Sequence, residues 1–375
     1  IFFIPYTASG FAACGKLFNS LFGINYQVAM MLSVLLIVGY TITGGFNAVC
    51  VTDLVQSIVM TGALAIVLIY GITRAGGWTA VMDNAAALPG YLSLTSTFDV
   101  ASGSEVKYNF LTIFSTAAWG LGYFGMPHIL VRFMAIEDEK KLVLSRRIAS
   151  VWVVIAMTAG VLIGIVGLGM TKAGALETLT GSNSETIIVR IAGIISQHNA
   201  LTALIAGIIL AGILAATMST ADSQMLAAAS GVSQNIVHDF LKIKISEKTN
   251  LLIARLTIVG IAIVSIFLAR NPNSSVFKIV SFAWAGFGGA FGAVVLCSLF
   301  WKRCNLAGAI AGIISGGATV FIWKYLIRPL GGILDIYELL PAFIVSLIFI
   351  IVVSLLTKAP DEEIVQEFEA ASQKA

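Results

Sequence analysis

The sequence predicts an all-α integral membrane protein. Hydrophobic residues make up 58% of the 375 residues and charged residues only 11%, whereas about a quarter of the residues of an average soluble domain are charged. The mean hydropathy is +0.96. The apolar residues form runs of about 18 to 25, which suffice to cross roughly 30 Å of hydrocarbon as helices and are too long for barrel strands.

Ten such runs predict ten membrane-spanning helices. No soluble domain separates them, so we expect one transmembrane domain over residues 1–357 and a cytoplasmic tail over 358–375. The predicted spans are roughly residues 1–20, 26–45, 48–73, 108–130, 147–171, 200–229, 250–270, 276–301, 306–327 and 336–357.

The first span opens with IFFIPYTASG, which contains no initiator Met, no charged region and no cleavage pattern. This indicates an N-terminal truncation rather than a signal peptide. The tail after Pro360 could form a short amphipathic helix, but a solvated and partly ordered end is the stronger expectation.

Basic residues crowd three of the loops, and tracing the spans in order puts these loops on one side of the membrane. The positive-inside rule makes that side cytoplasmic, together with the tail from Lys358. The long loops 74–107 and 172–199 then face the other side. The net charge of +3 therefore reflects the orientation of the chain in the membrane, and no nucleic-acid-binding patch is expected. The basic residues are Arg132, Lys140, Lys141, Arg146 and Arg147, then Lys242, Lys244 and Lys248, and finally Lys302 and Arg303.

Asp53 stands a few residues into the third span, where an acid costs about 2.5 to 3.5 kcal/mol at mid-membrane and less near the interface. Thr52 and Gln56 provide polar neighbours one turn apart. Asp53 could act on a cation, on a gate or on a helix N-terminus. An interfacial acid near a helix start is the alternative.

The fourth span contains Gly120, Gly122, Gly125 and Pro127, which together predict a kinked or broken helix. On an α-helix Trp119, Tyr123 and Pro127 would follow i, i+4, i+8, so that aromatic faces and freed carbonyls look into one space. Aromatic side chains that simply pack between helices are the alternative.

In the sixth span, the sequence GILAATMSTADS interrupts an apolar run with hydroxyls and a carboxylate. Ala216, Ser219, Thr220 and Ser223 follow i, i+3, i+4, i+7 and form one stripe on a helix. Neutral hydroxyl and carbonyl oxygens favour a small hard cation that must be released again. Unsatisfied polar groups cost several kcal/mol in a bilayer, so this stripe indicates a function.

Four separated motifs make the chain resemble the sodium/solute symporter family, most closely its proline-transporting members. The motifs are YTITGGFNAVCVTDLVQ, WGLGYFGMPHILVRFMA, LAATMSTADSQ and FAWAGFGGAFGAVVL, and GAIAGIISG is a looser fifth. The resemblance implies a LeuT-type core of two inverted five-helix repeats. Aligned on the motifs, the chain would lack the leading helix and core helices one and two. Residues 1–301 would form a partial core, with peripheral helices over 306–357.

The resemblance also implies a site. Sodium would bind at Ala216, Ser219 and Thr220, with Asp53 nearby to assist sodium exchange toward the cytoplasm, and further carbonyls would come from the first core helix. The solute would meet residues Tyr6, Trp119, Tyr123 and Pro127. Asp222 differs from the proline-transporter pattern and receives no function.

The implied activity is sodium-coupled import of L-proline by alternating access, in a multi-pass protein of the plasma (inner) membrane with a cytoplasmic C-terminus. Na⁺ is the coupling ion, and the partners are solute, sodium and the lipid bilayer. Another amino acid, pantothenate or a small organic acid is an alternative substrate, and a sensory input module is a further alternative. No enzyme is expected, since the three histidines are far apart and lack metal or triad spacing.

Overall fold

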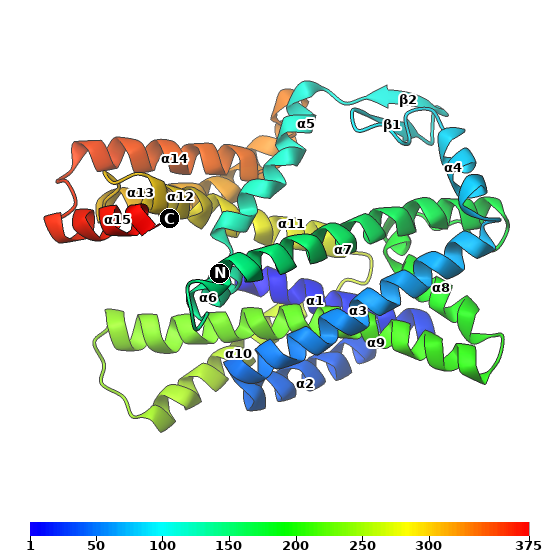
Figure 1. The fold of residues 1–375 in the computed structure, drawn as a ribbon, viewed down its shortest axis with the longest axis horizontal. Coiled ribbons are helices and arrows are strands. Elements are labelled where there is room, and N and C mark those ends of the chain that lie inside the picture. The colour runs from blue at the N-terminus through cyan, green and yellow to red at the C-terminus, as the bar shows by residue number, and fades with distance from the viewer. Residues whose placement is uncertain (375) are drawn as a thin grey trace. The chain divides into compact units, whose positions relative to one another are not determined.

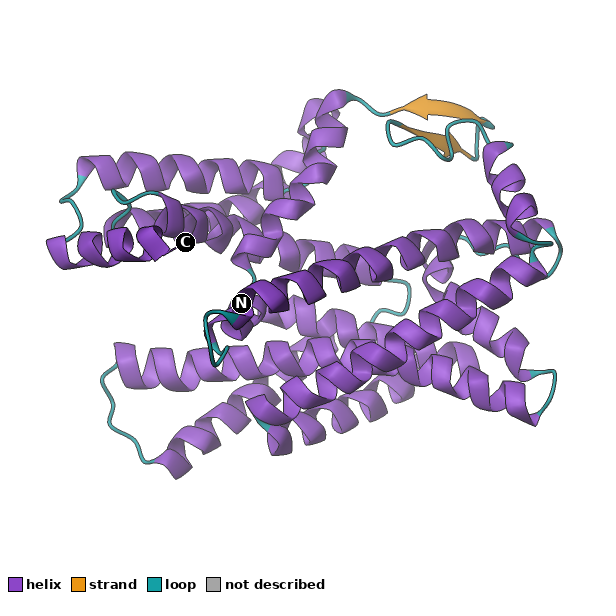
Figure 2. Ribbon diagram, in the orientation of Figure 1, coloured by secondary structure: helices purple, strands orange, loops and turns teal. Residues whose placement is uncertain are grey.

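The computed structural model describes residues 1–374, which form α-helices and one short β-hairpin (Figures 1 and 2). Eight helices in this range are long and apolar enough to cross a membrane. Helices occupy each of the ten predicted spans, although those that contain residues 3–22 and 110–134 are not among the eight. The prediction of an all-α membrane fold is therefore confirmed.

The chain forms two compact units. The first comprises residues 3–107 and 137–279 with Ile1, and the second comprises residues 108–136 and 280–375 with Phe2. The first unit contains α1 (Phe3–Phe22), α2 (Tyr26–Gly44), α3 (Phe46–Arg74), α4 (Trp78–Ala86), β1 (Ser96–Asp99), β2 (Ser104–Lys107), α7 (Lys141–Lys172), η2 (Gly181–Thr186), α8 (Ile187–Ser196), α9 (Ala200–Ser230), η3 (Gly231–Phe240), α10 (Glu247–Ala269) and the start of α11 (Val276–Phe287).

The second unit holds the interrupted helix and the C-terminal helices. Within it α13 and α14 run side by side over their length (Figure 1). Its elements are α5 (Phe110–Ala117), η1 (Ala118–Gly125), α6 (Pro127–Met134), the rest of α11, η4 (Gly288–Gly292), α12 (Ala293–Phe300), α13 (Leu306–Ile322), η5 (Trp323–Ile327), η6 (Arg328–Leu330), η7 (Gly332–Leu334), α14 (Leu339–Leu356) and α15 (Glu362–Lys374).

Polar residues at the ends of the apolar runs begin several helices. The Asn199 side chain accepts a hydrogen bond from the backbone N–H of Thr202, and the Thr202 hydroxyl accepts from that of Asn199, which forms a capping box at the start of α9. At the start of α10 the Ser246 side chain accepts a hydrogen bond from the backbone N–H of Thr249, and at the start of α13 the Asn305 side chain accepts one from that of Gly308. Such caps satisfy backbone donors that the first helical turn leaves free.

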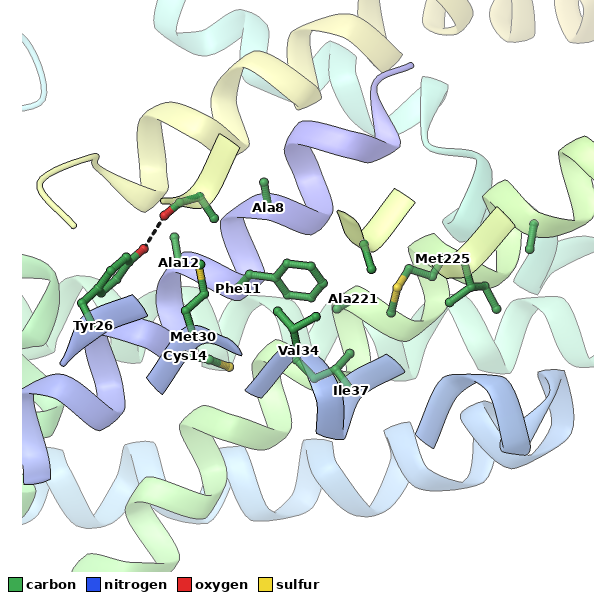
Figure 3. Close-up of a cluster of buried hydrophobic side chains, with 14 residues drawn as sticks. Ala8, Phe11, Ala12, Cys14, Tyr26, Met30, Val34, Ile37, Ala221 and Met225 are labelled. Carbon is green, nitrogen blue, oxygen red and sulfur yellow. Dashed lines mark hydrogen bonds between the residues drawn. The ribbon is translucent and has the colours of Figure 1, made fainter. Parts of the chain in front are cut away.

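One hydrophobic core cluster of the first unit lies between α1, α2, α9 and α10 (Figure 3), and another lies between α3, α7, α8 and α9. Phe11 of α1 is fully buried against Val34 of α2 and Ala221 of α9. At one end of this cluster the Tyr26 hydroxyl donates to the carbonyl oxygen of Ala269 at 2.6 Å, which ties α2 to the end of α10. The packing therefore fixes one side of α9, the helix that carries the hydroxyl stripe.

The helices α3 and α9 run antiparallel along each other. Near one end the Tyr70 hydroxyl lies 3.2 Å from Nε2 of His198, just before α9. Further along, Gly212 packs so closely against α3 that a Cβ there would come within 2.9 Å of the Cβ of Ala63. Small residues permit such close approach between helices in a membrane.

The loops and the tail contain more regular structure than the sequence predicts. Loop 74–107 contains α4 and an antiparallel hairpin in which Ser96 pairs with Lys107, and loop 172–199 contains η2 and α8. The chain beyond residue 229 continues through η3, a π-helix. The tail forms α15, which corrects the expectation of a partly ordered end. The first turn of α15 contains Glu362 and Glu363, whose negative charges interact favourably with the positive N-terminal end of the helix dipole.

Candidate solute and cation sites

Three oxygens of the predicted hydroxyl stripe lie together on one face of α9. The Ser219 Oγ donates to the carbonyl oxygen of Ala216 at 3.1 Å, and the Thr220 Oγ1 donates to the same oxygen at 3.0 Å. All three residues are half-buried. Hydroxyl and carbonyl oxygens are hard, neutral ligands. A small cation that used all three oxygens would replace both hydrogen bonds, because each hydroxyl would then turn a lone pair to the ion.

Asp53 of α3 lies at the level of this cluster. Gly212 packs against residues 59–63 of α3. Because the two helices are antiparallel and each rises about 1.5 Å per residue, Ser219, seven residues after Gly212, lies level with about residue 54. Asp53 is half-buried there. Its part in cation exchange stays a prediction.

A second carboxylate, for which the sequence predicts no function, stands close to the cluster in sequence. Asp222 is fully buried on α9, and its Oδ1 accepts a hydrogen bond from the backbone N–H of Ser223 at 2.6 Å. The next residue, Gln224, is also fully buried. The sequence signals this residue as an acid within the apolar run that also carries the hydroxyl stripe, since buried acids in spanning helices are expensive and usually functional.

Tyr6 lies near the start of α1, which packs beside the stripe. The Tyr6 side chain is half-buried, and its carbonyl oxygen accepts a hydrogen bond from the Ser9 hydroxyl at 2.6 Å. One turn later, a Cβ at Gly10 would lie 3.3 Å from the methyl group of Thr217 on α9. The structure thus places Tyr6 on a helix that packs against α9, within the same unit.

The predicted break in the fourth span is confirmed. The helix changes from α5 to the 3-10 helix η1, becomes extended at Met126 (φ −85°, ψ 103°), and resumes as α6 with Pro127 at its first position. Proline fits there because its missing N–H would have no helical partner. The face predicted for Trp119 and Tyr123 does not form, because residues four apart on a 3-10 helix point about 120° apart.

Trp119 and Tyr123 instead approach the same indole ring from different directions. Trp119 stacks on Trp284 of α11 with ring centroids 5.2 Å apart, whereas Tyr123 meets Trp284 edge-on at 4.7 Å. The Tyr123 side chain keeps 44% of its surface exposed. Tyr337, which precedes α14, also stacks on Trp119. Sequence reasoning missed Trp284 and Tyr337, although Trp284 lies within the FAWAGFGG motif.

Gly122 and Gly125 let η1 lie directly against the backbone of α11 and η4. A Cβ at Gly122 would collide with the Trp284 indole nitrogen, and one at Gly125 would collide with the carbonyl oxygen of Phe287. By contrast, a Cβ at Gly120 would meet nothing within 4 Å. Two of the three glycines therefore serve close packing.

Outside the spans, Glu185 of η2 joins three segments of the first unit. Its carboxylate accepts hydrogen bonds from Lys16 Nζ and Ser275 Oγ, each at 2.7 Å, and from the backbone N–H groups of Val276 and Phe277. Burial by itself raises the pKa of Glu185, but these donors outweigh it and hold the pKa below its ordinary value. Glu185 thus caps α11 and links it to α1.

A family model, described as the sodium:solute symporter family, matches residues 1–316. The chain is 40% identical over 360 residues to the osmoregulated proline transporter OpuE of Bacillus subtilis (strain 168). The matched region covers 96% of this chain and 69% of that relative. The chain is also 37% identical over 366 residues to a sodium/proline symporter of Staphylococcus aureus, and this match covers 96% of the chain and 68% of the relative.

A solved structure of a Na⁺-coupled sialic acid symporter in a substrate-bound, outward-open state is similar with a TM-score of 0.72. The similarity covers 96% of this chain and 74% of the other at 19% identity, so it bears on the fold alone. It confirms the predicted LeuT-type fold class. With the motifs, the interrupted helix and the family match in agreement, the chain belongs to the sodium:solute symporter family.

Proposed function

We propose that this protein is a sodium-coupled symporter that imports L-proline by alternating access. The main support for L-proline as the substrate is the 40% identity, over 96% of the chain, to a protein named a proline transporter. The sodium/proline symporter of Staphylococcus aureus, at 37% identity, supports the same substrate and names the coupling ion.

The geometry supports sodium as the co-transported cation. Ala216, Ser219 and Thr220 offer three neutral oxygens within hydrogen-bond distance on one helix. Neutral ligands bind a cation weakly enough for release, whereas several carboxylates would hold it tightly, as in high-affinity calcium sites. Asp53, level with these oxygens on α3, supplies a nearby negative charge that assists sodium exchange.

For the solute we propose Tyr6 on α1 and Trp119, Tyr123 and Pro127 on the interrupted helix. An interrupted helix presents half-helix ends, whose partial charges match the two ends of a zwitterion without buried ionic side chains. Tyr123 combines an apolar ring with an exposed surface, which suits contact with a pyrrolidine ring. Trp119 gives the adjoining wall.

The driving force is sufficient for uptake against a gradient. One sodium ion that moves inward gains about 2.3 kcal/mol per 100 mV, and each tenfold sodium gradient adds about 1.4 kcal/mol. The sum of about 3.7 kcal/mol could concentrate a co-transported solute roughly 500-fold. Weak, reversible binding at both sites is then compatible with net import.

In the membrane we propose a cytoplasmic C-terminus and a plasma-membrane location, because the loops rich in Lys and Arg fall on the same side as α15 when the spans are traced in order. Substituted-cysteine labelling at Ser372 of α15 from either side of oriented vesicles tests this orientation. Labelling from the cytoplasmic side alone is expected.

The substrate is tested by competition. Uptake of labelled L-proline by the full-length protein in proteoliposomes is measured against excess unlabelled solutes: L-proline, other amino acids, pantothenate and short organic acids. Unlabelled proline should compete at the lowest concentration. A different solute that competes better than proline would replace proline in the proposal.

A further inference from the structure

Three aromatic rings from separate segments of the second unit meet beside the interrupted helix. Trp119 of η1 stacks on Trp284 of α11 with centroids 5.2 Å apart and an interplanar angle of 15°. It also stacks on Tyr337 with centroids 5.8 Å apart and an angle of 18°. We call Trp119, Trp284 and Tyr337 the aromatic stack. Two neighbouring rings, nearly parallel to it, restrict the orientation of the Trp119 indole.

Hydrogen bonds fix the stack to the backbone on both sides. The Trp284 Nε1–H donates to the carbonyl oxygen of Trp119 at 2.9 Å. The Tyr337 hydroxyl donates to the carbonyl oxygen of Ser281 on α11 at 2.7 Å, and the Tyr337 backbone N–H donates to Ser115 Oγ on α5 at 2.6 Å. Tyr337 therefore bridges the helix before the break and the helix that faces it.

An ion cluster holds the turn that carries Tyr337. The adjacent side chain, Glu338, is 1% exposed, and its two carboxylate oxygens lie 3.2 Å from Lys324 Nζ and 3.0 Å from Arg328 Nη1. Arg328 Nε also contacts Asp335 at 2.8 Å. A buried carboxylate is tolerated only when it is paired and hydrogen-bonded. The cluster thus joins η5 and η6, which follow α13, to the start of α14 directly beside Tyr337.

We propose that Tyr337 and Trp284 are positioning residues for solute binding. They hold Trp119, and with it the solute-facing part of η1, in a fixed orientation before the solute arrives, and the Glu338 ion cluster sets where Tyr337 lies. Pre-ordered side chains bind more tightly because less motion is lost on binding. The inference rests on the proposed function, since it assumes that Trp119 contacts the transported solute.

The first test compares Tyr337→Leu, which removes the ring, with Tyr337→Phe, which keeps the ring and removes the hydroxyl. Sodium-dependent proline binding and initial uptake rates are measured in the full-length protein. Loss of one aromatic pair should raise the half-saturating proline concentration about two- to tenfold. Tyr337→Phe should restore most of the affinity. The maximal rate and the half-saturating sodium concentration at saturating proline should change little.

The matched control is Tyr325→Leu, which removes an exposed ring that contacts Phe282 and Phe321. This variant should bind proline like the parent. Unchanged proline affinity in Tyr337→Leu, or an equal loss in Tyr325→Leu, would overturn the proposal. So would an equal fall of proline affinity, sodium affinity and maximal rate in Tyr337→Leu, because that pattern reports general loosening.

Two further measurements keep the inference testable if Tyr337→Leu does not fold or if proline is not the solute. Glu338→Gln leaves the stack intact but weakens the ion cluster, and it should lower proline affinity in the same direction by a smaller factor. In the parent, Tyr337→Leu and Glu338→Gln, acrylamide quenching of tryptophan fluorescence is measured with and without the additional change Trp119→Phe, and the difference gives the contribution of Trp119. Without any solute, acrylamide should quench Trp119 more strongly in either variant than in the parent. Unchanged accessibility in both would refute the positioning role, whereas absent proline binding in the parent would refute only the proposed substrate.

Discussion

The Thr220 hydroxyl donates to the carbonyl oxygen of Ala216 at 3.0 Å, one turn earlier on the same helix. Ser219 donates to the same oxygen at 3.1 Å. These bonds gather the three candidate sodium ligands without any ion, at the cost of directing both hydroxyl protons at the carbonyl. Sodium binding then exchanges two hydrogen bonds for ion contacts, which keeps net affinity moderate. Moderate affinity is what a coupled transporter requires.

Removal of the Thr220 hydroxyl should weaken sodium binding. Thr220→Ala is expected to raise the half-saturating sodium concentration about ten- to hundredfold, since a bond to a charged group contributes about 1.5 to 3 kcal/mol. Thr220→Ser should retain most of the affinity. Thr257→Ala serves as a control, because Thr257 makes the same kind of bond, to Ile253 on α10, away from the cluster. Proline uptake over a range of sodium concentrations measures all three, and equal curves for Thr220→Ala and the parent would exclude Thr220 as a ligand.

Asp53 should affect the rate of sodium exchange more than the affinity for proline. Asp53→Asn removes the charge at nearly constant size, and a barrier higher by about 1.4 kcal/mol would slow maximal uptake tenfold. Asp83→Asn, at an exposed acid on α4, should be neutral. The measurement is the initial rate at saturating proline against sodium concentration. A parent-like rate in Asp53→Asn would remove Asp53 from the cation path.

The glycines of η1 should differ sharply in their tolerance of alanine. Gly125→Ala directs a methyl group into the carbonyl oxygen of Phe287, and overpacking of this kind costs about 1 to 3 kcal/mol. Gly120→Ala meets open space and should not destabilise the fold. Thermal unfolding of the purified variants in detergent compares the two midpoints. Equal midpoints would mean that η1 does not lie against η4 as described.

Glu185 should make stability depend on pH in a defined direction. The pKa of Glu185 is lowered in the folded protein. Its contribution to the free energy of unfolding is therefore present above the pKa of the unfolded chain, about 4.3, and is lost as the pH falls through the pKa of the folded protein. Glu185→Gln should therefore lower the unfolding midpoint at pH 7, and the difference from the parent should shrink below about pH 4.

Glu177→Gln is the matched control for this pH effect, since Glu177 pairs with Arg190 at 3.5 Å with 63% of its side chain exposed. Exposed pairs of this kind contribute little. A pH profile of Glu185→Gln that runs parallel to the parent down to acid pH would contradict the role of the charge.

The spans, the break at Pro127 and the oxygen cluster at Ala216 could be predicted because each depends on local chemistry: apolar length, a missing amide hydrogen and a 3.6-residue period. The prediction of a single face for Trp119 and Tyr123 was wrong, because it assumed α-helical spacing. Residues 118–125 form a 3-10 helix, in which Gly122 packs closely on Trp284. Tyr337 could not be found from sequence, since its contact with Trp119 joins residues more than 200 positions apart. The bonds of Glu185 to Lys16 and Ser275, which join residues 169 and 90 positions apart, could not be found from sequence either.

Sodium-dependent uptake of L-proline is the decisive measurement for sodium-coupled import. The full-length protein is reconstituted into proteoliposomes, and uptake of labelled L-proline is measured with an inward sodium gradient and with choline in place of sodium. We expect concentrative uptake in sodium, little uptake in choline, and loss of the sodium response at low sodium in Thr220→Ala. Proline uptake at equal rates in sodium and in choline would show that transport is not coupled to sodium.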